Sequence, residues 1–337
     1  SATMSAFQAY AYGFAWRALR LAAAATLIGW VIWGELQDRQ PDEWLNFWRC
    51  LPATPRYPAL IVAAALVPLN WLLEALKWRA LFSCALRPSL ARAFRAVVAG
   101  LAAALVTPHR MGEYFGRIWM LAPSQRVPGL VAGALSSLCN QIAIGLAGAI
   151  GVWGMAQGAL DQWADPGAVR TIASACLFGL ILAYVLLPRA LPRLLKYVAG
   201  SKLAPAIVKV LQKTDPPTPS RLHAGLGLAA LRYAVYAGQL MAIVWFFHIP
   251  ESAIQLLLAI FSLFFAQTLL PLPALAGLAV RGALSLKLLR ACGVPPCACI
   301  ASTYLLWILN LFLPALVGTF FLFCVKIEKS ESHDDAP

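Results

Sequence analysis

The chain has 337 residues, of which 61% are hydrophobic and only 12% are charged. Soluble domains are roughly half apolar and about a quarter charged, so this composition excludes a soluble globular protein. The formal net charge of +13 would suggest a nucleic-acid partner in a soluble protein. Here the basic residues follow apolar segments, so they indicate membrane topology and attraction to anionic lipid instead of nucleic acid.

Six apolar segments are long enough to be transmembrane helices. In chain order they are residues 15–34, 58–76, 129–154, 169–187, 223–247 and 297–325. Two further apolar regions, 94–121 and 253–290, are interrupted by TPHRMGEY and by LLPLPALAG. Each predicts a helix, a Pro/Gly break and a shorter helix. Irregular backbone at membrane depth is tolerated only inside protein or beside a wet cavity.

Lys and Arg gather in two loops, 77–95 and 188–222, which are therefore predicted to be cytoplasmic. The loop 155–168 contains two acidic residues and no basic one, so it is predicted to lie outside. Every loop fits if the six segments cross the membrane and the two interrupted regions are re-entrant hairpins that enter from opposite faces. Lys287 and Arg290 are exceptions, because they then lie outside. Eight ordinary spans with proline kinks are the alternative.

The predicted elements form an inverted repeat. Residues 15–154 and 169–325 each contain two spans, a hairpin and a span, in opposite orientations, as in many secondary transporters. We therefore predict an all-α polytopic membrane protein of six full spans and two re-entrant helical hairpins, with one transmembrane domain, 15–325. The segment 1–14 precedes it, with a cloning remnant before Met4, and a disordered tail, 326–337, follows. Both termini are predicted to be cytoplasmic, in the inner membrane of a bacterium.

Only two acidic residues, Glu74 and Glu113, lie within apolar regions. A charge at the bilayer centre costs about 3 kcal/mol or more, so both are functional candidates. Asn70, Glu74 and Lys77 share one helix face. Asn70 and Glu74 are either part of a substrate site or a structural hydrogen-bonding clasp. Lys77 and Trp78 are interpreted as the interfacial end of a span, with Lys77 reaching to the cytoplasm.

The first break places His109 and Arg110 near the N-terminus of a short helix, where free N–H groups and the helix dipole favour an anion. An arginine there suits phosphate. Glu113 and Arg117 are four residues apart and are expected to pair. The functional interpretation is a phosphate-sized anion at the break, with Glu113 orienting the arginines or exchanging a proton. The alternative is a Glu113–Arg117 pair that only stabilises the hairpin.

Other polar side chains within apolar regions are assigned to substrate binding or to hydrogen bonding between helices. Arg281 is expected to meet Glu74, Glu113 or a ligand phosphate. The remaining residues are Gln267 before the second break, the stripe formed by Arg232, Tyr236 and Gln239, and the amides Asn140, Gln141 and Asn310.

Motifs for metal and nucleotide chemistry are missing from the sequence: there is no HExxH, GxGxxG or P-loop, and no aspartate pair that could hold Mg²⁺. No cofactor, metal or catalytic residue is therefore predicted. Cys292, Cys297 and Cys299 cluster without a histidine or carboxylate, and they are interpreted as small packing residues instead of a metal site or disulfide.

Three blocks, NWLLEALKWRALF, LVTPHRMGEYFGRIWML and LLPLPALAGLAVRGALSL, resemble the lysylphosphatidylglycerol synthase transmembrane-region family, the flippase-like domain. The resemblance covers residues 15–325 and is most specific at Pro108, Gly112, Glu113 and Arg117. It implies a bundle with two re-entrant hairpins that moves a lipid between leaflets. The family's soluble synthase domain has no counterpart here, so lipid aminoacylation is not implied. Arg281 stands where the family often has an acid, so specificity for a lysyl lipid is not implied either.

The resulting hypothesis is a non-enzymatic lipid translocase for an anionic phospholipid or a polyprenyl-linked lipid. Its partners are membrane lipids, and no oligomeric state is predicted. Two alternatives stay open. One is an intramembrane lipid-modifying enzyme that uses Glu113 or His109 as a base, and the other is a membrane partner subunit of a lipid-synthesis enzyme.

Overall fold

The computed structural model describes residues 56–83, 85–107, 111–156, 165–200, 217–248, 252–269 and 276–321, and over these ranges the chain is helical without a strand. Five helical segments in this part are long and apolar enough to cross a membrane: Tyr57–Ala80, Pro123–Met155, Pro166–Leu191, Pro219–Phe247 and Pro296–Phe321. They confirm the all-α membrane class and five of the predicted spans. The predicted first span, 15–34, and the tail lie outside the described residues.

The long helices are α3 (Tyr57–Ala80), α6 (Arg126–Met155), α7 (Pro166–Gly200) and α9 (Pro219–Phe247), and α12 (Pro296–Trp307) continues through a π-helix. A proline in the first turn of α3, α9 and α12 starts each helix, because its missing N–H has no intrahelical partner there. Ser89, Asp165 and Ser252 cap α4 (Leu90–Val106), α7 and α10 (Ala253–Leu269) by accepting backbone hydrogen bonds.

The first hairpin consists of α4 and α5 (Gly112–Trp119), which pack antiparallel. A Cβ on Gly112 would overlap the carbonyl of Ala103, and a Cβ on Gly116 would lie 2.7 Å from the carbonyl oxygen of Ala99. At the turn, Thr107 Oγ1 accepts from Gly112 N at 2.7 Å and donates to Ala103 O at 2.8 Å. The interrupted helix predicted over 94–121 is therefore confirmed, and glycines allow its two arms to touch.

Both ends of the first hairpin lie at the same end of the bundle. Gln125, just after α5, donates through Nε2 to the carbonyl of Leu86, just before α4, at 3.1 Å. Leu121 also packs in one core cluster with Phe82 and Ala93. The chain thus enters and leaves this hairpin beside the C-terminal end of α3.

The second hairpin consists of α10 and α11 (Ala276–Arg290), again with a break between two helices, as predicted for 253–290. Leu256 near its start and Leu289 near its end share a core cluster with Val294. Helix α10 packs closely on α6, where a Cβ on Gly151 would lie 2.7 Å from Leu258 O. This hairpin therefore also returns to the end of the bundle at which it begins.

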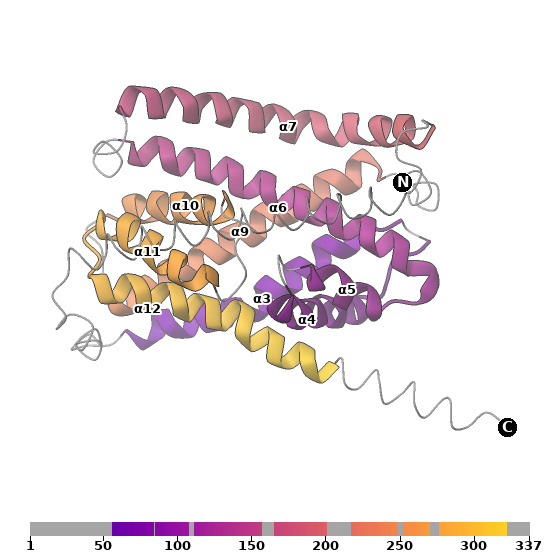
Figure 1. The fold of residues 1–337 in the computed structure, drawn as a ribbon, viewed down its shortest axis with the longest axis horizontal. Helices are drawn as coiled ribbons and strands as arrows, with labels where there is room; N and C mark the ends of the chain where they lie inside the picture. Colours follow the sequence, from indigo (N-terminus) through magenta and orange to yellow (C-terminus); the bar gives the residue numbers. More distant parts are fainter. Residues whose placement is uncertain are drawn as a thin grey trace, which may run out of the picture.

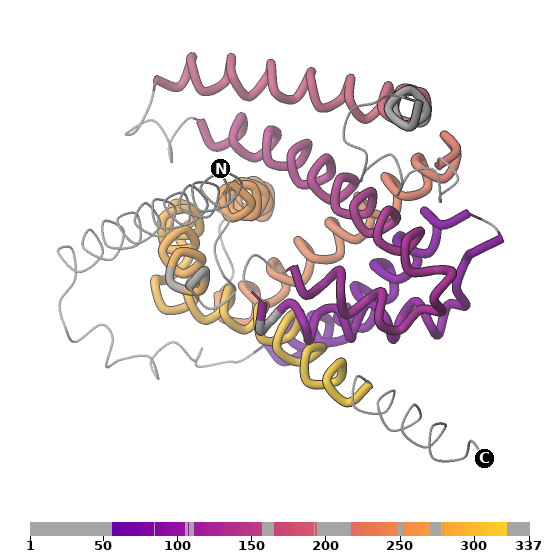
Figure 2. Tube along the Cα trace, turned by 45° about the vertical axis from the view of Figure 1, so that its right-hand side comes forward, coloured from indigo at the N-terminus to yellow at the C-terminus, as the bar shows by residue number. Residues whose placement is uncertain are grey.

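The two hairpins lie at opposite ends of the bundle, with α3, α6 and α9 running between them (Figure 1). Helices α3 and α9 pack against each other, and α7 packs on α6 and α9 at the edge of the bundle. Figure 2 shows the same separation of the hairpins from another direction. The helical segment after α12 reaches the first hairpin, where a Cβ on Gly318 would overlap the carbonyl of Val98.

A π-helix, Ile308–Phe312, interrupts the last span. Asn310 lies within it and donates through Nδ2 to the carbonyl of Leu306 at 3.2 Å. Its Oδ1 accepts from Asn70 of α3 at 2.5 Å. π-Helical turns occur mostly as single-turn bulges inside α-helices, frequently at functional sites, and this one fastens α12 to α3 through Asn310.

The cysteine cluster behaves only partly as expected. Cys292 and Cys299 are buried, in agreement with a packing role. Cys297, however, is disulfide-bonded, so its interpretation as a packing residue is wrong. It lies at the N-terminal end of α12, away from the middle of the apolar span.

Candidate functional site

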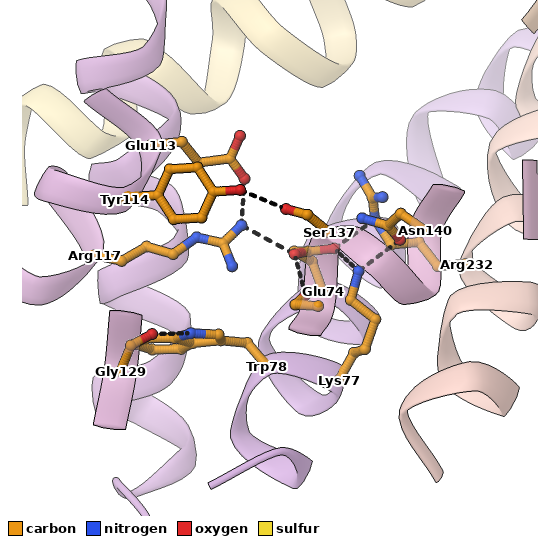
Figure 3. Close-up of polar contacts among 11 residues, drawn as sticks. Glu74, Lys77, Trp78, Glu113, Tyr114, Arg117, Gly129, Ser137, Asn140 and Arg232 are labelled. Atoms are coloured by element: carbon orange, nitrogen blue, oxygen red, sulfur yellow. Dashed lines mark hydrogen bonds and ion pairs between the residues drawn. The ribbon is translucent and has the colours of Figure 1, made fainter. Parts of the chain in front are cut away.

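Glu74 lies at the centre of a polar cluster that joins four helices (Figure 3). Its Oε2 accepts from Lys77 Nζ at 2.6 Å and lies 3.3 Å from Arg232 Nε on α9. Its Oε1 accepts from Arg117 Nη2 of α5 at 2.9 Å and from Ser136 Oγ of α6 at 3.2 Å. We call the set the ion cluster: Glu74, Lys77, Glu113, Arg117, Ser136, Asn140 and Arg232.

The ion cluster has a buried centre and two partly exposed members. Glu74, Lys77 and Arg117 are buried, whereas 25% of the Glu113 side chain and 29% of the Arg232 side chain are exposed. Figure 3 shows these two on opposite sides of Glu74. Two carboxylates face three cations when all are ionised, so the cluster carries one surplus positive charge. Such a site favours an anion at its exposed side.

Arg117 confirms the predicted pair with Glu113 and extends it. Its Nη2 binds both Glu113 Oε1 and Glu74 Oε1, and its guanidinium lies 5.7 Å from the ring of Trp78. A pair that served the hairpin alone would not reach α3. Arg117 therefore connects the first hairpin to the helix that carries Glu74.

The interfacial interpretation of Lys77 and Trp78 is wrong. Lys77 is fully buried, and its Nζ donates to Asn140 Oδ1 at 2.6 Å as well as to Glu74. Trp78 is also fully buried and donates through Nε1 to Gly129 O at 3.2 Å. The reason is that the first hairpin and the start of α6 cover this end of α3. Both side chains therefore make their hydrogen bonds inside the bundle.

Asn70 supports the structural alternative. It is buried, and its Nδ2 binds Asn310 across to the last span. It lies one turn before Glu74 on the same face of α3. Asn70 therefore fastens α12 to the helix of the ion cluster.

The other predicted residues divide into those that the structure brings to Glu74 and those that it does not. Arg232 joins the ion cluster, whereas Tyr236, one turn further, packs against Phe264 with ring centroids 4.8 Å apart. Gln267 is half-buried near the end of α10. Arg281 is not among the cations bound to Glu74, and Glu113 and a ligand phosphate stay its predicted partners. His109 and Arg110 lie outside the described residues.

Sequence reasoning named Asn140 of α6 as an amide for hydrogen bonding between helices but missed the serines of this helix. Ser136 binds Glu74, Asn140 binds Lys77, and Ser137 Oγ lies 2.8 Å from the hydroxyl of Tyr114 on α5. Ser136 and Asn140 are four residues apart, so they share a face, and this spacing in an apolar helix was the available signal. Among the described residues, no group of His, Cys, Asp and Glu side chains could hold a metal ion.

A family model described as the lysylphosphatidylglycerol synthase transmembrane region matches residues 17–318. No curated protein matches the chain. The matched range includes every described helix that contributes to the ion cluster.

Proposed function

Because the chain belongs to the lysylphosphatidylglycerol synthase transmembrane-region family, we propose that this integral membrane protein is a lipid translocase. It moves an anionic phospholipid or a polyprenyl-linked lipid between leaflets. The ion cluster is the observation that carries the proposal, because buried charge in an apolar bundle is expensive and marks a substrate or ion pathway. Arg232, partly exposed at the side of the cluster, contacts the head group while the lipid tails stay in the bilayer.

Packing between the halves supports an inverted repeat. Gly151 of α6 approaches the backbone of α10, and Gly318 of the last span approaches the backbone of α4. Each half thus packs its final span on the first arm of the other half's hairpin. Arg117 and Arg281 are each the sixth residue of their hairpin's second helix. Such repeats place substrate sites where broken helices meet near the midplane.

The charge distribution supports the proposed orientation. Basic residues gather at the end where the first hairpin begins and ends: Arg87, Arg92, Arg95, Arg126 and Arg221. This end is cytoplasmic by the positive-inside rule. The disulfide-bonded Cys297 belongs to the opposite end, and disulfides persist in oxidising compartments outside the cytoplasm. The two hairpins are then re-entrant, one from each face of the membrane.

Cysteine labelling tests this topology. In spheroplasts, a membrane-impermeant maleimide is expected to label Ala291→Cys directly and Ser124→Cys only after permeabilisation, because both positions are exposed but lie on opposite sides. Native Cys292 is a poor reporter, since burial raises the pKa of its thiol to about 11. The exposed Cys176 is replaced by serine in both variants. Labelling of Ser124→Cys from outside only would support eight ordinary spans instead.

Reconstitution tests the transport itself. Proteoliposomes containing the protein and fluorescent phosphatidylglycerol are expected to move the lipid between leaflets, measured as the fraction protected from dithionite. Arg232→Gln is expected to slow this movement by about tenfold, the equivalent of one charge-assisted hydrogen bond. The control is Arg189→Gln, an exposed arginine of α7 outside the ion cluster. Lipid movement equal to that of empty liposomes for the wild-type protein would refute the proposal.

A further inference from the structure

We infer that Lys77 takes up one proton when a lipid phosphodiester binds at Arg232, so that the protein moves the lipid together with a proton. The inference rests on the proposed lipid translocation and adds the ion that accompanies the lipid. Arg232 binds the phosphodiester, Lys77 binds the proton, and Glu74 contacts both side chains.

The hydrogen bonds of Lys77 suit a neutral amine as well as an ammonium. Its Nζ donates to Glu74 Oε2 and to Asn140 Oδ1, each at 2.6 Å, and these are its acceptors among the described residues. An ammonium has three N–H donors, so one is left without an acceptor there, whereas an amine uses both of its donors. Lys77 can therefore lose or gain a proton while both hydrogen bonds persist.

Lys77 is also the member of the ion cluster that can release a proton. Arg117 and Arg232 stay protonated, because a guanidinium does not titrate in proteins. Glu74 and Glu113 act as carboxylates toward these cations and have no proton to lose. Of the three cations in the cluster, Lys77 is thus the one whose charge can change.

Charged and titratable groups face Lys77 from several helices. Glu74 shares α3 with it, Arg117 comes from α5 and Arg232 from α9. From α6 it faces the buried thiol of Cys139. Helix α4 also packs on α3, but the arginines of α4 are exposed. Two cations and one carboxylate therefore surround the amine, so a further charge that enters the cluster changes how tightly Lys77 holds its proton.

Coupled binding keeps the ion cluster neutral with and without the lipid. With Lys77 uncharged, the two carboxylates of Glu74 and Glu113 face two arginines. With Lys77 protonated and a phosphodiester bound, three anionic groups face three cations. Charge without a counter-charge is costly in an apolar bundle, so the phosphodiester and the proton stabilise each other. By linkage, the protein binds the lipid more tightly when Lys77 is protonated.

Arg232 is the cation that is available to the phosphodiester. Its Nε lies 3.3 Å from Glu74 Oε2, the longest ion pair of the cluster, and makes no hydrogen bond to the described residues. Its side chain is partly exposed, whereas Lys77 and Arg117 are buried. The planar fork of a guanidinium suits the oxygens of a phosphate group.

Glu74 connects Lys77 with the exposed side of the cluster. The same oxygen, Oε2, accepts from Lys77 Nζ and lies next to Arg232 Nε. On lipid binding, a proton from water adds to Glu74 Oε2 and passes to Nζ, which converts the amine to an ammonium and restores the carboxylate. On lipid release, the same steps run backwards. The net reaction is the transfer of one proton between water and Lys77.

Equilibrium binding tests the coupling apart from transport. The affinity of the purified, delipidated protein for fluorescent phosphatidylglycerol is measured in detergent from about pH 7 to about pH 10, a range in which lysines lose their proton. The affinity should fall by about tenfold or more as the pH rises. Lys77→Met fixes the neutral form and should bind weakly at every pH. Lys77→Arg fixes the charge and should bind tightly at every pH.

Two controls isolate the effect of Lys77. Lys287→Met makes the same change at a lysine of α11 outside the ion cluster, and Cys139→Ala removes the thiol that faces Lys77. Both variants should keep the pH dependence of the wild-type protein. A pH-independent affinity of the wild-type protein would overturn the inference, and so would an unchanged pH dependence in Lys77→Met.

Proton uptake by the wild-type protein is a second readout, which needs no variant. In a weakly buffered solution with a pH-sensitive dye, saturation with phosphatidylglycerol should take up a net amount approaching about one proton per bound lipid, at the pH where the affinity changes. Diacylglycerol, which lacks phosphate, should cause no uptake. If phosphatidylglycerol binds without proton uptake at every pH in this range, the coupling is refuted even if the Lys77 variants do not fold.

A pH gradient tests the coupling in transport. In proteoliposomes with an acidic exterior, labelled phosphatidylglycerol is expected to accumulate in the inner leaflet, measured as the fraction protected from dithionite. Lys77→Met should abolish this accumulation and Lys287→Met should preserve it. Equal distribution of the lipid despite the gradient would refute co-transport with a proton.

The two proposals fail in distinguishable ways. If lipid moves but neither its binding nor its distribution depends on protons, translocation stands and the coupling is refuted. If lipid binding takes up a proton but reconstituted protein moves no lipid, the proton site at Lys77 stands and translocation is refuted.

Discussion

Glu74→Gln is expected to lower the free energy of unfolding by about 3–5 kcal/mol, which is the usual cost of removing one partner of a buried charge pair. Glu74 is the common counter-ion of Lys77, Arg117 and Arg232. The neutral amide leaves these cations close together in an apolar bundle without their shared counter-ion. Thermal unfolding in detergent, followed by tryptophan fluorescence, measures the change.

Two further variants separate the loss of the counter-ion from a general sensitivity of α3 to substitution. Glu113→Gln removes a partly exposed carboxylate, so it should destabilise much less than Glu74→Gln. Lys77→Met added to Glu74→Gln removes one of the unpaired buried charges and should restore part of the lost stability. Equal unfolding temperatures for Glu74→Gln and wild-type protein would show that the cluster does not hold the bundle together.

Gly112→Ala is expected to destabilise the protein by about 1–3 kcal/mol, as overpacking in a close-packed interior does. The added Cβ would overlap the backbone carbonyl of Ala103, which cannot move without shifting α4. It would also crowd Thr107 Oγ1, the atom that pairs the backbone groups at the turn. Because Arg117 follows on the same short helix, opening the hairpin also pulls it from Glu74. Thermal unfolding and the lipid-movement assay both report the effect.

The matched control for this substitution is Gly238→Ala on α9, where no atom lies within 4 Å of the added Cβ. Alanine favours the helix over glycine by about 1 kcal/mol, so this control should be neutral or slightly stabilising. If the two substitutions change the unfolding temperature equally, the close approach of α4 and α5 at Gly112 does not contribute to stability.

The sequence predicted the helices well because their signal is local. Hydropathy alone identified each described span, and Pro and Gly identified both breaks, since these residues remove backbone hydrogen bonds or permit close approach. Glu74 was recognisable because an acidic side chain in an apolar helix is too costly to be incidental. These inferences need no knowledge of what packs against the helix.

The partners of Glu74 were not predictable in the same way. Lys77 stands near the end of an apolar run, and the local pattern of such a lysine is the same whether it reaches water or a buried carboxylate. Only the position of α6 and the first hairpin decides between these outcomes. For the same reason Arg232, which is distant in sequence, was not recognised as a partner of Glu74. Cys297 likewise gave no local sign of its disulfide.

The π-helix at Ile308–Phe312 has a consequence for the alignment of the last span. A π-turn accommodates one more residue than an α-turn, and each residue rotates an α-helix by about 100°. Winding these residues as a regular α-helix would therefore turn the following segment, and Gly318 would no longer face Val98. A residue with a side chain would then meet the first hairpin. The inserted residue thus sets the rotation of the second part of the helix relative to the first. As a result, Asn310 faces α3 and Gly318 faces α4.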